Sequence, residues 1–258
     1  MRIHSEKTMD LKSFFEINNK LAVAFSGGVD SSFLLFAAVN SGADVTAYYV
    51  KSQFQPDFEF RDAKTVADRC GATLRVIEIN VLSEAKIRSN PPDRCYYCKN
   101  VIMGSILQEA RRDGYDLVID GTNASDDTND RPGYRALKEL AVRSPLRECG
   151  ITKSEVRRLA HEAGLHVWNK PAYACLATRI PHGEAITAEK LSVTEKAESI
   201  LYDMGYRDFR VRMRGENALV QICSDQHSRA LSEHDRIEER LSALYGRVDI
   251  DETARQGQ

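Results

Sequence analysis

LAVAFSGGVDSS, at residues 21–32, is the segment that decides the fold class of this chain. Its apolar first part, 21–25, predicts a buried strand, and the apolar run at 33–39 predicts a helix directly after it. Between the two, Gly27 and Gly28 permit a tight turn in which the backbone can approach a ligand closely. Because the first amide groups of a helix have no partner within it, this strand, turn and helix predict a site for a phosphate group.

The loop differs from two common phosphate-binding motifs. It lacks the lysine of the Gly-x-x-x-x-Gly-Lys-Ser/Thr loop, and it lacks the Gly-x-Gly-x-x-Gly pattern of dinucleotide-binding folds. Its SGGVDSS sequence resembles the PP-loop of ATP pyrophosphatases, which cleave ATP between the α and β phosphates. The resemblance implies that ATP and Mg²⁺ bind here, at Ser26, Gly27, Gly28, Val29, Asp30, Ser31 and Ser32. A glycine-serine turn that binds nothing is the alternative interpretation.

Composition narrows the class of protein. The 258 residues contain 36 Lys and Arg against 38 Asp and Glu, so the formal net charge is −2. This balance argues against general affinity for nucleic acid and favours a small-molecule substrate. The apolar run at 33–39 is far shorter than the roughly 18 residues of a membrane span, so we expect no membrane partner and a cytoplasmic location.

Strand-like and helix-like segments alternate through the first part of the chain. Strands are expected at 21–25, 45–50, 73–79 and 117–120, and helices near 32–40, 58–70, 99–112, 133–140 and 153–164. Such alternation predicts an α/β fold with a doubly wound parallel sheet, which binds ligands at the carboxyl ends of its strands. The later order predicts a small C-terminal α+β domain, with a helix at 188–204, strands at 208–213 and 217–222, a helix at 225–244 and a strand at 248–250.

The six cysteines favour thiol chemistry or metal ligation over a disulfide framework. Cys95 and Cys98 form a C-x-x-C pair in PPDRCYYCK, on a loop expected just before the helix at 99–112. One such pair is compatible with zinc, a redox couple or an iron-sulfur site. Cys175 is the natural third ligand, and three cysteines without a fourth suggest an iron-sulfur cluster with one open iron. A structural zinc site or reduced thiols are the alternatives, and we interpret the others as packing residues: Cys70, Cys149 and Cys223.

Two further patterns place polar groups where an anion could bind. Asp120-Gly121-Thr122-Asn123 follows a predicted strand at its carboxyl end, although a polar turn is the simpler explanation. Arg210, Arg212 and Arg214 alternate along a predicted strand and therefore project from one face. Three like charges in a row favour an anionic ligand, and a solvated strand face is the alternative.

Together, the PP-loop, the C-x-x-C segment, DGTN at 120–123, RSPL at 143–146 and ACLATRIP at 174–181 resemble the LarE family of ATP-dependent sulfur transferases, over about residues 10 to 225. The resemblance implies an adenine nucleotide α-hydrolase-like domain at 1–180, a small sulfur-transfer domain at 181–258 and a hexamer. It implies a pyridinium-3,5-biscarboxylic acid mononucleotide substrate, adenylated and converted to a thiocarboxylate for the nickel-pincer cofactor. It assigns ligand binding to Gly121, Thr122, Asn123, Arg179, Arg212 and Arg214.

The cysteines also distinguish two ways of supplying sulfur in that family. Members with only the cysteine matching Cys175 give up its own sulfur and retain dehydroalanine. Members that also have the pair matching Cys95 and Cys98 resemble those that hold a [4Fe-4S] cluster on three cysteines. This chain has all three, which predicts Cys95, Cys98 and Cys175 as catalytic cluster ligands. Sacrifice of Cys175, tRNA thiolation and a non-catalytic ATP-binding module are the alternatives.

Overall fold

The structure is a computed structural model that describes residues 10–127 and 132–256. By its internal contacts the chain divides into two compact units. The first consists of Met1–Ser52, Asp57–Ile79 and Cys95–Lys170, and the second of Gln53–Pro56, Asn80–Arg94 and Pro171–Gln258. The predicted boundary between the two domains, after residue 180, is a separate question from this division and stays a prediction.

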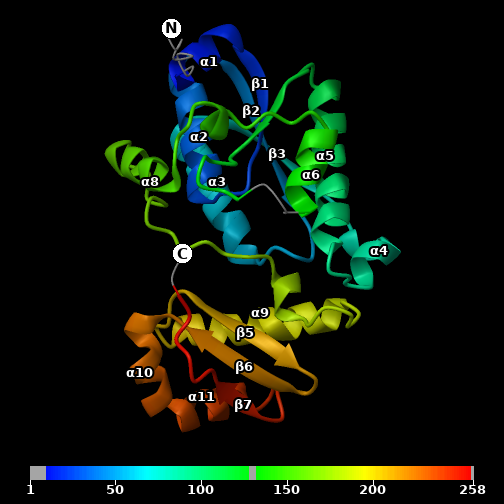
Figure 1. The fold of residues 1–258 in the computed structure, drawn as a ribbon, viewed down its shortest axis with the longest axis vertical. Helices are drawn as coiled ribbons and strands as arrows, with labels where there is room; N and C mark the ends of the chain where they lie inside the picture. The colour runs from blue at the N-terminus through cyan, green and yellow to red at the C-terminus, as the bar shows by residue number, and fades with distance from the viewer. Residues whose placement is uncertain (1–9, 128–131, 257–258) are drawn as a thin grey trace, which may run out of the picture. The chain divides into compact units, whose positions relative to one another are not determined.

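A parallel sheet forms the centre of the first unit, as the alternating pattern predicts (Figure 1). Its strands, in the order β3-β2-β1-β4, are β1 (Lys20–Ala24), β2 (Asp44–Lys51), β3 (Thr73–Glu78) and β4 (Val118–Asp120). Ala22 of β1 pairs with Thr46 on one side and with Val118 on the other. Because β1 is covered on both faces, its apolar run is continuous rather than alternating, and Leu21 and Val23 are fully buried.

Helices cover both faces of this sheet (Figure 1). One face packs against α1 (Leu11–Ile17), α2 (Val29–Asn40), α3 (Asp57–Cys70) and α8 (Lys153–Glu162). The other face packs against α5 (Arg94–Arg112) and α6 (Pro132–Glu139), through Met103, Ile106 and Leu137. The doubly wound α/β prediction is confirmed. No helix in the described ranges is long and apolar enough to cross a membrane.

The second unit is a small α+β assembly. Its sheet has the order β5-β6-β7, with β5 and β6 antiparallel and β6 and β7 parallel. Its elements are η1 (Val81–Ser83), α4 (Ala85–Arg88), η2 (Leu176–Arg179), α9 (Ala188–Asp203), β5 (Phe209–Arg214), β6 (Asn217–Ile222), α10 (Ser224–Ser232), α11 (His234–Leu241) and β7 (Val248–Ile250). The single helix expected at 225–244 is wrong, because the chain leaves helical geometry at Glu233, where Tyr206 donates a hydrogen bond to the Glu233 carboxylate at 2.9 Å.

The position of the C-x-x-C pair also differs from the prediction. Helix α5 begins at Arg94 rather than near residue 99, so Cys95 and Cys98 lie in its first turn and not on a loop before it. The Arg94 amide donates to the Pro91 carbonyl at 2.9 Å, which starts the turn early.

Candidate functional site

The loop between β1 and α2 is shaped by two glycines. Gly27 has φ +76°, a backbone conformation that side chains rarely adopt, and a Cβ atom there would lie 2.8 Å from the Ala63 Cβ. Gly28 is the N-cap of α2, and its carbonyl accepts the first helical hydrogen bond, from the Ser32 amide at 3.0 Å. The backbone therefore lies close against α3, and the N-terminus of α2 follows directly.

Serine side chains brace this loop from within. The Ser31 hydroxyl donates to the Gly28 carbonyl at 3.2 Å, lies 3.1 Å from the Ser26 hydroxyl and accepts from the Ser26 amide at 3.3 Å. The Ser32 hydroxyl is buried and has no hydrogen-bond partner among the described residues. A buried hydroxyl without a partner is costly, and a loop that binds a ligand is a setting in which it is retained.

The turn after β4 lies against the first turn of α2. A Cβ atom on Gly121 would be 2.8 Å from the Ser31 amide nitrogen, so only glycine permits this approach. The buried Asp120 carboxylate accepts hydrogen bonds from the Thr122 hydroxyl and from the Ser144 hydroxyl, both at 2.7 Å. The carboxyl ends of β1 and β4 thus meet, and the 143–146 segment joins them through Ser144.

Asp30 connects α2 to two distant parts of the first unit. Its Oδ1 accepts from the Asn123 side-chain amide at 3.1 Å, and its Oδ2 accepts from the Lys153 Nζ at 2.5 Å. Lys153 is the first residue of α8, which begins with a capping box formed by Thr152 and Glu155. Lys153 was not predicted as a site residue, and Ser144 was named only as part of the RSPL motif. The capping pattern could have identified the helix start, but no local signal relates Lys153 to a carboxylate 123 positions away.

Cys95 and Cys98 are one helical turn apart in α5 and lie on the same side of it. Cys95 is exposed and Cys98 is half-buried. Between them, the Tyr96 hydroxyl donates to Glu139 at 2.6 Å. The buried Arg94 guanidinium donates to Asn90 Oδ1 at 2.5 Å and to the Ala177 carbonyl at 3.0 Å, so it holds other parts of the chain together.

Cys175 belongs to a loop that is anchored by one buried carboxylate, Glu198. Glu198 accepts from Arg179 Nε at 2.7 Å, from Arg179 Nη2 at 3.0 Å, from the Tyr173 hydroxyl at 2.5 Å and from the Val211 amide at 3.0 Å. Arg179 is only 1% exposed. Burial opposes its charge, but the hydrogen bonds and charge of Glu198, with Tyr173 and the nearby Cys175 thiol, raise the Arg179 pKa.

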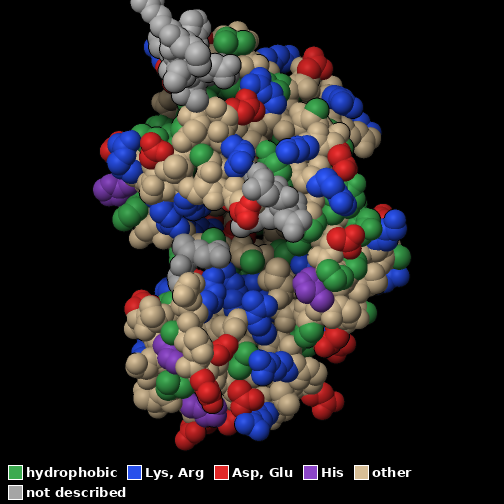
Figure 2. Space-filling view, viewed as in Figure 1, with side chains coloured by type: hydrophobic (Ala, Val, Ile, Leu, Met, Phe, Trp, Pro, Cys, Tyr) green, Lys and Arg blue, Asp and Glu red, His purple; other side chains and the backbone are tan. Residues whose placement is uncertain are grey.

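Two arginines of β5 contact the same loop. Arg212 Nη1 donates to the Thr178 carbonyl at 2.8 Å, and Arg210 Nη2 donates to the Ala172 carbonyl at 2.5 Å. Arg210 is 5% exposed, and burial, together with Arg179 and Arg255, lowers its pKa to about 10. Arg214 lies exposed at the end of the strand. Figure 2 shows Lys and Arg side chains gathered on the second unit. The prediction selected Arg212 and Arg214 and omitted Arg210, although the alternating pattern contained it.

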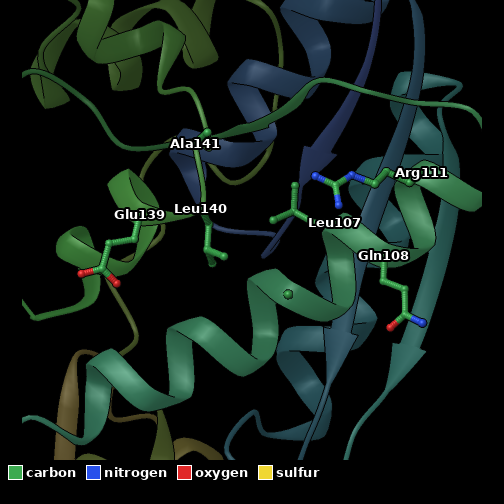
Figure 3. A pocket seen from close by; sticks show the side chains of 7 residues that line it. Leu107, Gln108, Arg111, Glu139, Leu140 and Ala141 are labelled. Atoms are coloured by element: carbon green, nitrogen blue, oxygen red, sulfur yellow. The ribbon is translucent and has the colours of Figure 1, made fainter.

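A surface pocket of about 570 Å³ lies elsewhere in the first unit, between α5 and the end of α6 (Figure 3). Leu107 and Leu140 point into it, and none of the predicted site residues lines it. Within residues 10–127 and 132–256, no group of three or more His, Cys, Asp or Glu side chains is placed to hold a metal ion. The predicted ligands Cys95 and Cys98 lie in the first unit and Cys175 in the second.

Comparison with known proteins agrees with this architecture. Residues 17–219 match the family model described as asparagine synthase, so the fold and its loop define a PP-loop enzyme that uses ATP. The chain is 36% identical to an uncharacterized protein of Synechocystis sp., over 85% of this chain and 82% of that protein. It is 34% identical to the pyridinium-3,5-bisthiocarboxylic acid mononucleotide synthase of Lactiplantibacillus plantarum, over 87% and 82%. A tRNA-specific 2-thiouridylase of Pseudothermotoga lettingae is 25% identical, over 81% and 74%.

The chain belongs to the LarE family of PP-loop ATP-dependent sulfurtransferases.

Proposed function

We propose that this enzyme adenylates a carboxylate of pyridinium-3,5-biscarboxylic acid mononucleotide and converts it to a thiocarboxylate, a step toward a nickel-pincer cofactor. The observation that carries the proposal is the 34% identity, over 87% of this chain, to a synthase named for the bisthiocarboxylic product. The strand, glycine turn and helix of the first unit support the ATP-dependent part.

The loop residues 26–32 and the DGTN turn fit a bound triphosphate. Cβ atoms at Gly27 and Gly121 would occupy space that the close backbone approach needs, and the α2 N-terminus offers amide groups to an anion. In the adenylation step, a substrate carboxylate oxygen attacks the α-phosphorus. The bond from that phosphorus to the bridging oxygen breaks, and pyrophosphate leaves toward the loop amides.

Mg²⁺ fits the same region because carboxylate oxygen is the ligand that this cation prefers. Asp30 would hold it, since its carboxylate lies on the first turn of α2 beside the loop. Bound there, the cation offsets charge on the phosphate oxygens. The Asp120 carboxylate, in contrast, is buried and already accepts from Thr122 and Ser144, so it positions the turn that carries Gly121 to Asn123.

Arginines of β5 are suited to the anionic ends of the substrate. A guanidinium group binds a phosphate or a carboxylate through two parallel hydrogen bonds, which a lysine cannot reproduce. We therefore assign the nucleotide phosphate and the second carboxylate to Arg212 and Arg214. Arg210 and Arg179 hold the Ala172 to Thr178 loop beside them through the Ala172 carbonyl and Glu198. Removal of one such fork weakens binding by roughly 1.5 to 3 kcal/mol.

We assign sulfur handling to Cys95, Cys98 and Cys175. The two thiols of α5 are one turn apart on one side of the helix, an arrangement that suits two ligands of a [4Fe-4S] cluster. Cys95, Cys98 and Cys175 would hold such a cluster, and with three cysteine ligands one iron would be left to bind sulfide. A sulfur nucleophile attacks the acyl carbon of the adenylate, the carbon-oxygen bond to AMP breaks, and AMP leaves. If Cys175 is instead sacrificed, its thiolate attacks the acyl carbon and AMP leaves. Loss of the Cys175 Cα proton then breaks the Cβ–Sγ bond, which gives the thiocarboxylate and leaves dehydroalanine at position 175.

The experiment that tests the adenylation measures AMP and pyrophosphate after ATP, Mg²⁺ and the pyridinium nucleotide are mixed with the protein. We expect both products in equal amounts, and we expect Asp30→Asn to suppress them, because Asp30 would hold the cation. Asp235→Asn, an exposed carboxylate on α11, is the control and should leave product formation unchanged. ADP and phosphate as products would refute cleavage between the α and β phosphates.

Transfer RNA is the alternative substrate, because thiouridylases are among the relatives, at 25% identity. The net charge of −2 disfavours it. Adding unmodified tRNA in place of the pyridinium nucleotide separates the two, since we expect no AMP formation with tRNA. The hexamer stays a proposal from the family resemblance, and light scattering of the purified protein tests it.

A further inference from the structure

Each oxygen of the Asp30 carboxylate accepts a hydrogen bond from a side chain of another segment. Lys153 Nζ contacts Oδ2 at 2.5 Å, and Asn123 Nδ2 contacts Oδ1 at 3.1 Å. The side chains of Lys153 and Asp30 are 32% and 22% exposed, so water and small ions reach the pair. The ion pair therefore occupies the carboxylate that the proposed function gives to Mg²⁺.

The negative charge of the Asp30 carboxylate has to be compensated by a cation, both with and without a bound nucleotide. Asp30 lies on the first turn of α2, next to the amide groups that would receive pyrophosphate. A bare carboxylate there would repel the phosphates, because like charges at short range in a partly buried site are weakly screened. In the ligand-free protein, the Lys153 ammonium group compensates the negative charge of Asp30.

The backbone around Lys153 is fixed by hydrogen bonds of its own, and the side chain extends from it to Asp30. The Lys153 amide donates to the Ser125 hydroxyl at 3.0 Å, and the Thr152 and Glu155 capping box fixes the start of α8. A change of partner by the ammonium group thus requires only rotation of a flexible four-carbon chain. Asn123 keeps its hold on Oδ1 while Oδ2 changes partner.

We propose that Lys153 and the divalent cation alternate on Asp30. Lys153 neutralises the carboxylate when the loop is empty. When the metal-nucleotide complex binds, the cation takes Asp30 Oδ2 and the ammonium group is released to an anionic oxygen of the nucleotide. Lys153 is on this account a positioning residue that keeps the empty site from loading metal without nucleotide. The inference rests on the proposed function, because it assumes that ATP binds at this loop.

The test measures Mn²⁺ binding to the full chain by electron paramagnetic resonance, without any nucleotide. Because the competing ammonium is removed, Lys153→Met should tighten Mn²⁺ binding about 1.5-fold to fivefold. Lys153→Arg retains the charge and should bind Mn²⁺ like the unmodified protein. Lys190→Met is the matched control, since Lys190 is 30% exposed and pairs with Glu184 at 3.1 Å in the second unit. It should change nothing.

The double variant Lys153→Met with Asp30→Asn tests whether any gain in Mn²⁺ affinity depends on the Asp30 carboxylate. We expect the gain to be lost completely in this variant. Unchanged Mn²⁺ affinity in Lys153→Met, including no detectable binding by either protein, would overturn the exchange, as would a gain that survives in the double variant. Circular dichroism of each variant verifies folding, and Lys153→Gln serves as a second neutral variant if Lys153→Met is poorly folded.

A second measurement, ATP binding by calorimetry with Mg²⁺ present, should show about 1.5-fold to fivefold weaker binding in Lys153→Met, because no ammonium group is then available to contact the nucleotide. Equal ATP affinity of the two proteins would contradict the proposed transfer of the Lys153 ammonium group to the nucleotide. The Mn²⁺ measurement needs neither turnover nor the pyridinium substrate. Its failure is therefore distinguishable from failure of the proposed function, which would appear as absent AMP formation in the unmodified protein.

Discussion

At the scale of single residues, Gly27 shows how one missing side chain defines the loop. The sequence suggests a tight turn, and the structure supplies two separate reasons for glycine. The positive φ disfavours any side chain, and the neighbouring Ala63 leaves no room for a Cβ atom. Gly42 has a similar φ of +80° but nothing within 4 Å of its Cβ position. Comparing substitutions at Gly27 and Gly42 therefore distinguishes the cost of backbone strain from the cost of steric crowding.

We expect Gly42→Ala to lower the free energy of unfolding by about 1 kcal/mol, from the left-handed conformation alone. Gly27→Ala should cost about 1–3 kcal/mol more, because α3 or the loop must move to admit the methyl group. Urea unfolding followed by circular dichroism measures both. If the two variants are equally destabilised, Ala63 yields without cost and the crowding argument is wrong.

At the scale of elements, the Cys175 loop is anchored by α9 and β5 in addition to its own hydrogen bonds. Glu198 on α9 receives both nitrogens of the Arg179 fork and the Tyr173 hydroxyl, so residues on both sides of Cys175 are tied to one carboxylate. Burying an ion pair this completely does not guarantee net stability. Removing one partner, however, leaves the other charge uncompensated in the interior.

Glu198→Gln should therefore lower the free energy of unfolding of the second unit by about 3 kcal/mol, since Arg179 stays charged and buried. It should also speed alkylation of Cys175, because the loop loses its anchor. Urea unfolding and mass spectrometry after iodoacetamide treatment measure the two effects. Glu239→Gln on α11, where the side chain is exposed, is the control. A loss below 1 kcal/mol with unchanged alkylation would show that the loop holds its shape without Glu198.

At the scale of the whole molecule, the six cysteines differ in their chemistry. Cys223 is buried, and burial together with a hydrogen bond to Asp225 raises its pKa to about 11. A thiol with so high a pKa is a poor ligand, because metals bind the thiolate. Burial also raises the pKa of Cys70 and of Cys149. The predicted ligands Cys95, Cys98 and Cys175 are exposed or half-buried.

Protein purified without oxygen should contain iron and sulfide, and replacing Cys95, Cys98 or Cys175 by Ala should abolish both, since three ligands leave no spare. Cys223→Ala should retain them, because that thiol stays protonated near neutral pH. Iron and acid-labile sulfide analysis, with the absorbance of the cluster, measures the content. Full iron content in Cys175→Ala would refute the three-cysteine assignment and favour a site on α5 alone.

The sequence by itself determined the features that depend on neighbours along the chain. The periodicity of apolar residues and the placement of glycines were enough to predict the strand, PP-loop and helix at 20–40 and the parallel sheet. The motifs were enough to identify the family. Local signals were less sufficient for helix ends. The early start of α5 at Arg94 and the break at Glu233 coincide with hydrogen bonds that apolar periodicity does not encode.

Only the tertiary structure decided which polar side chains meet within each unit. Lys153 and Asp30 are 123 positions apart, Ser144 and Asp120 are 24 apart, and Glu198 and Arg179 are 19 apart. Each of these residues is an ordinary polar residue in its own segment, and the sequence offers many other carboxylates or cations with which it could pair. The packing of helices on the sheet selects one pairing among them, because the burial of apolar faces sets where each polar side chain emerges.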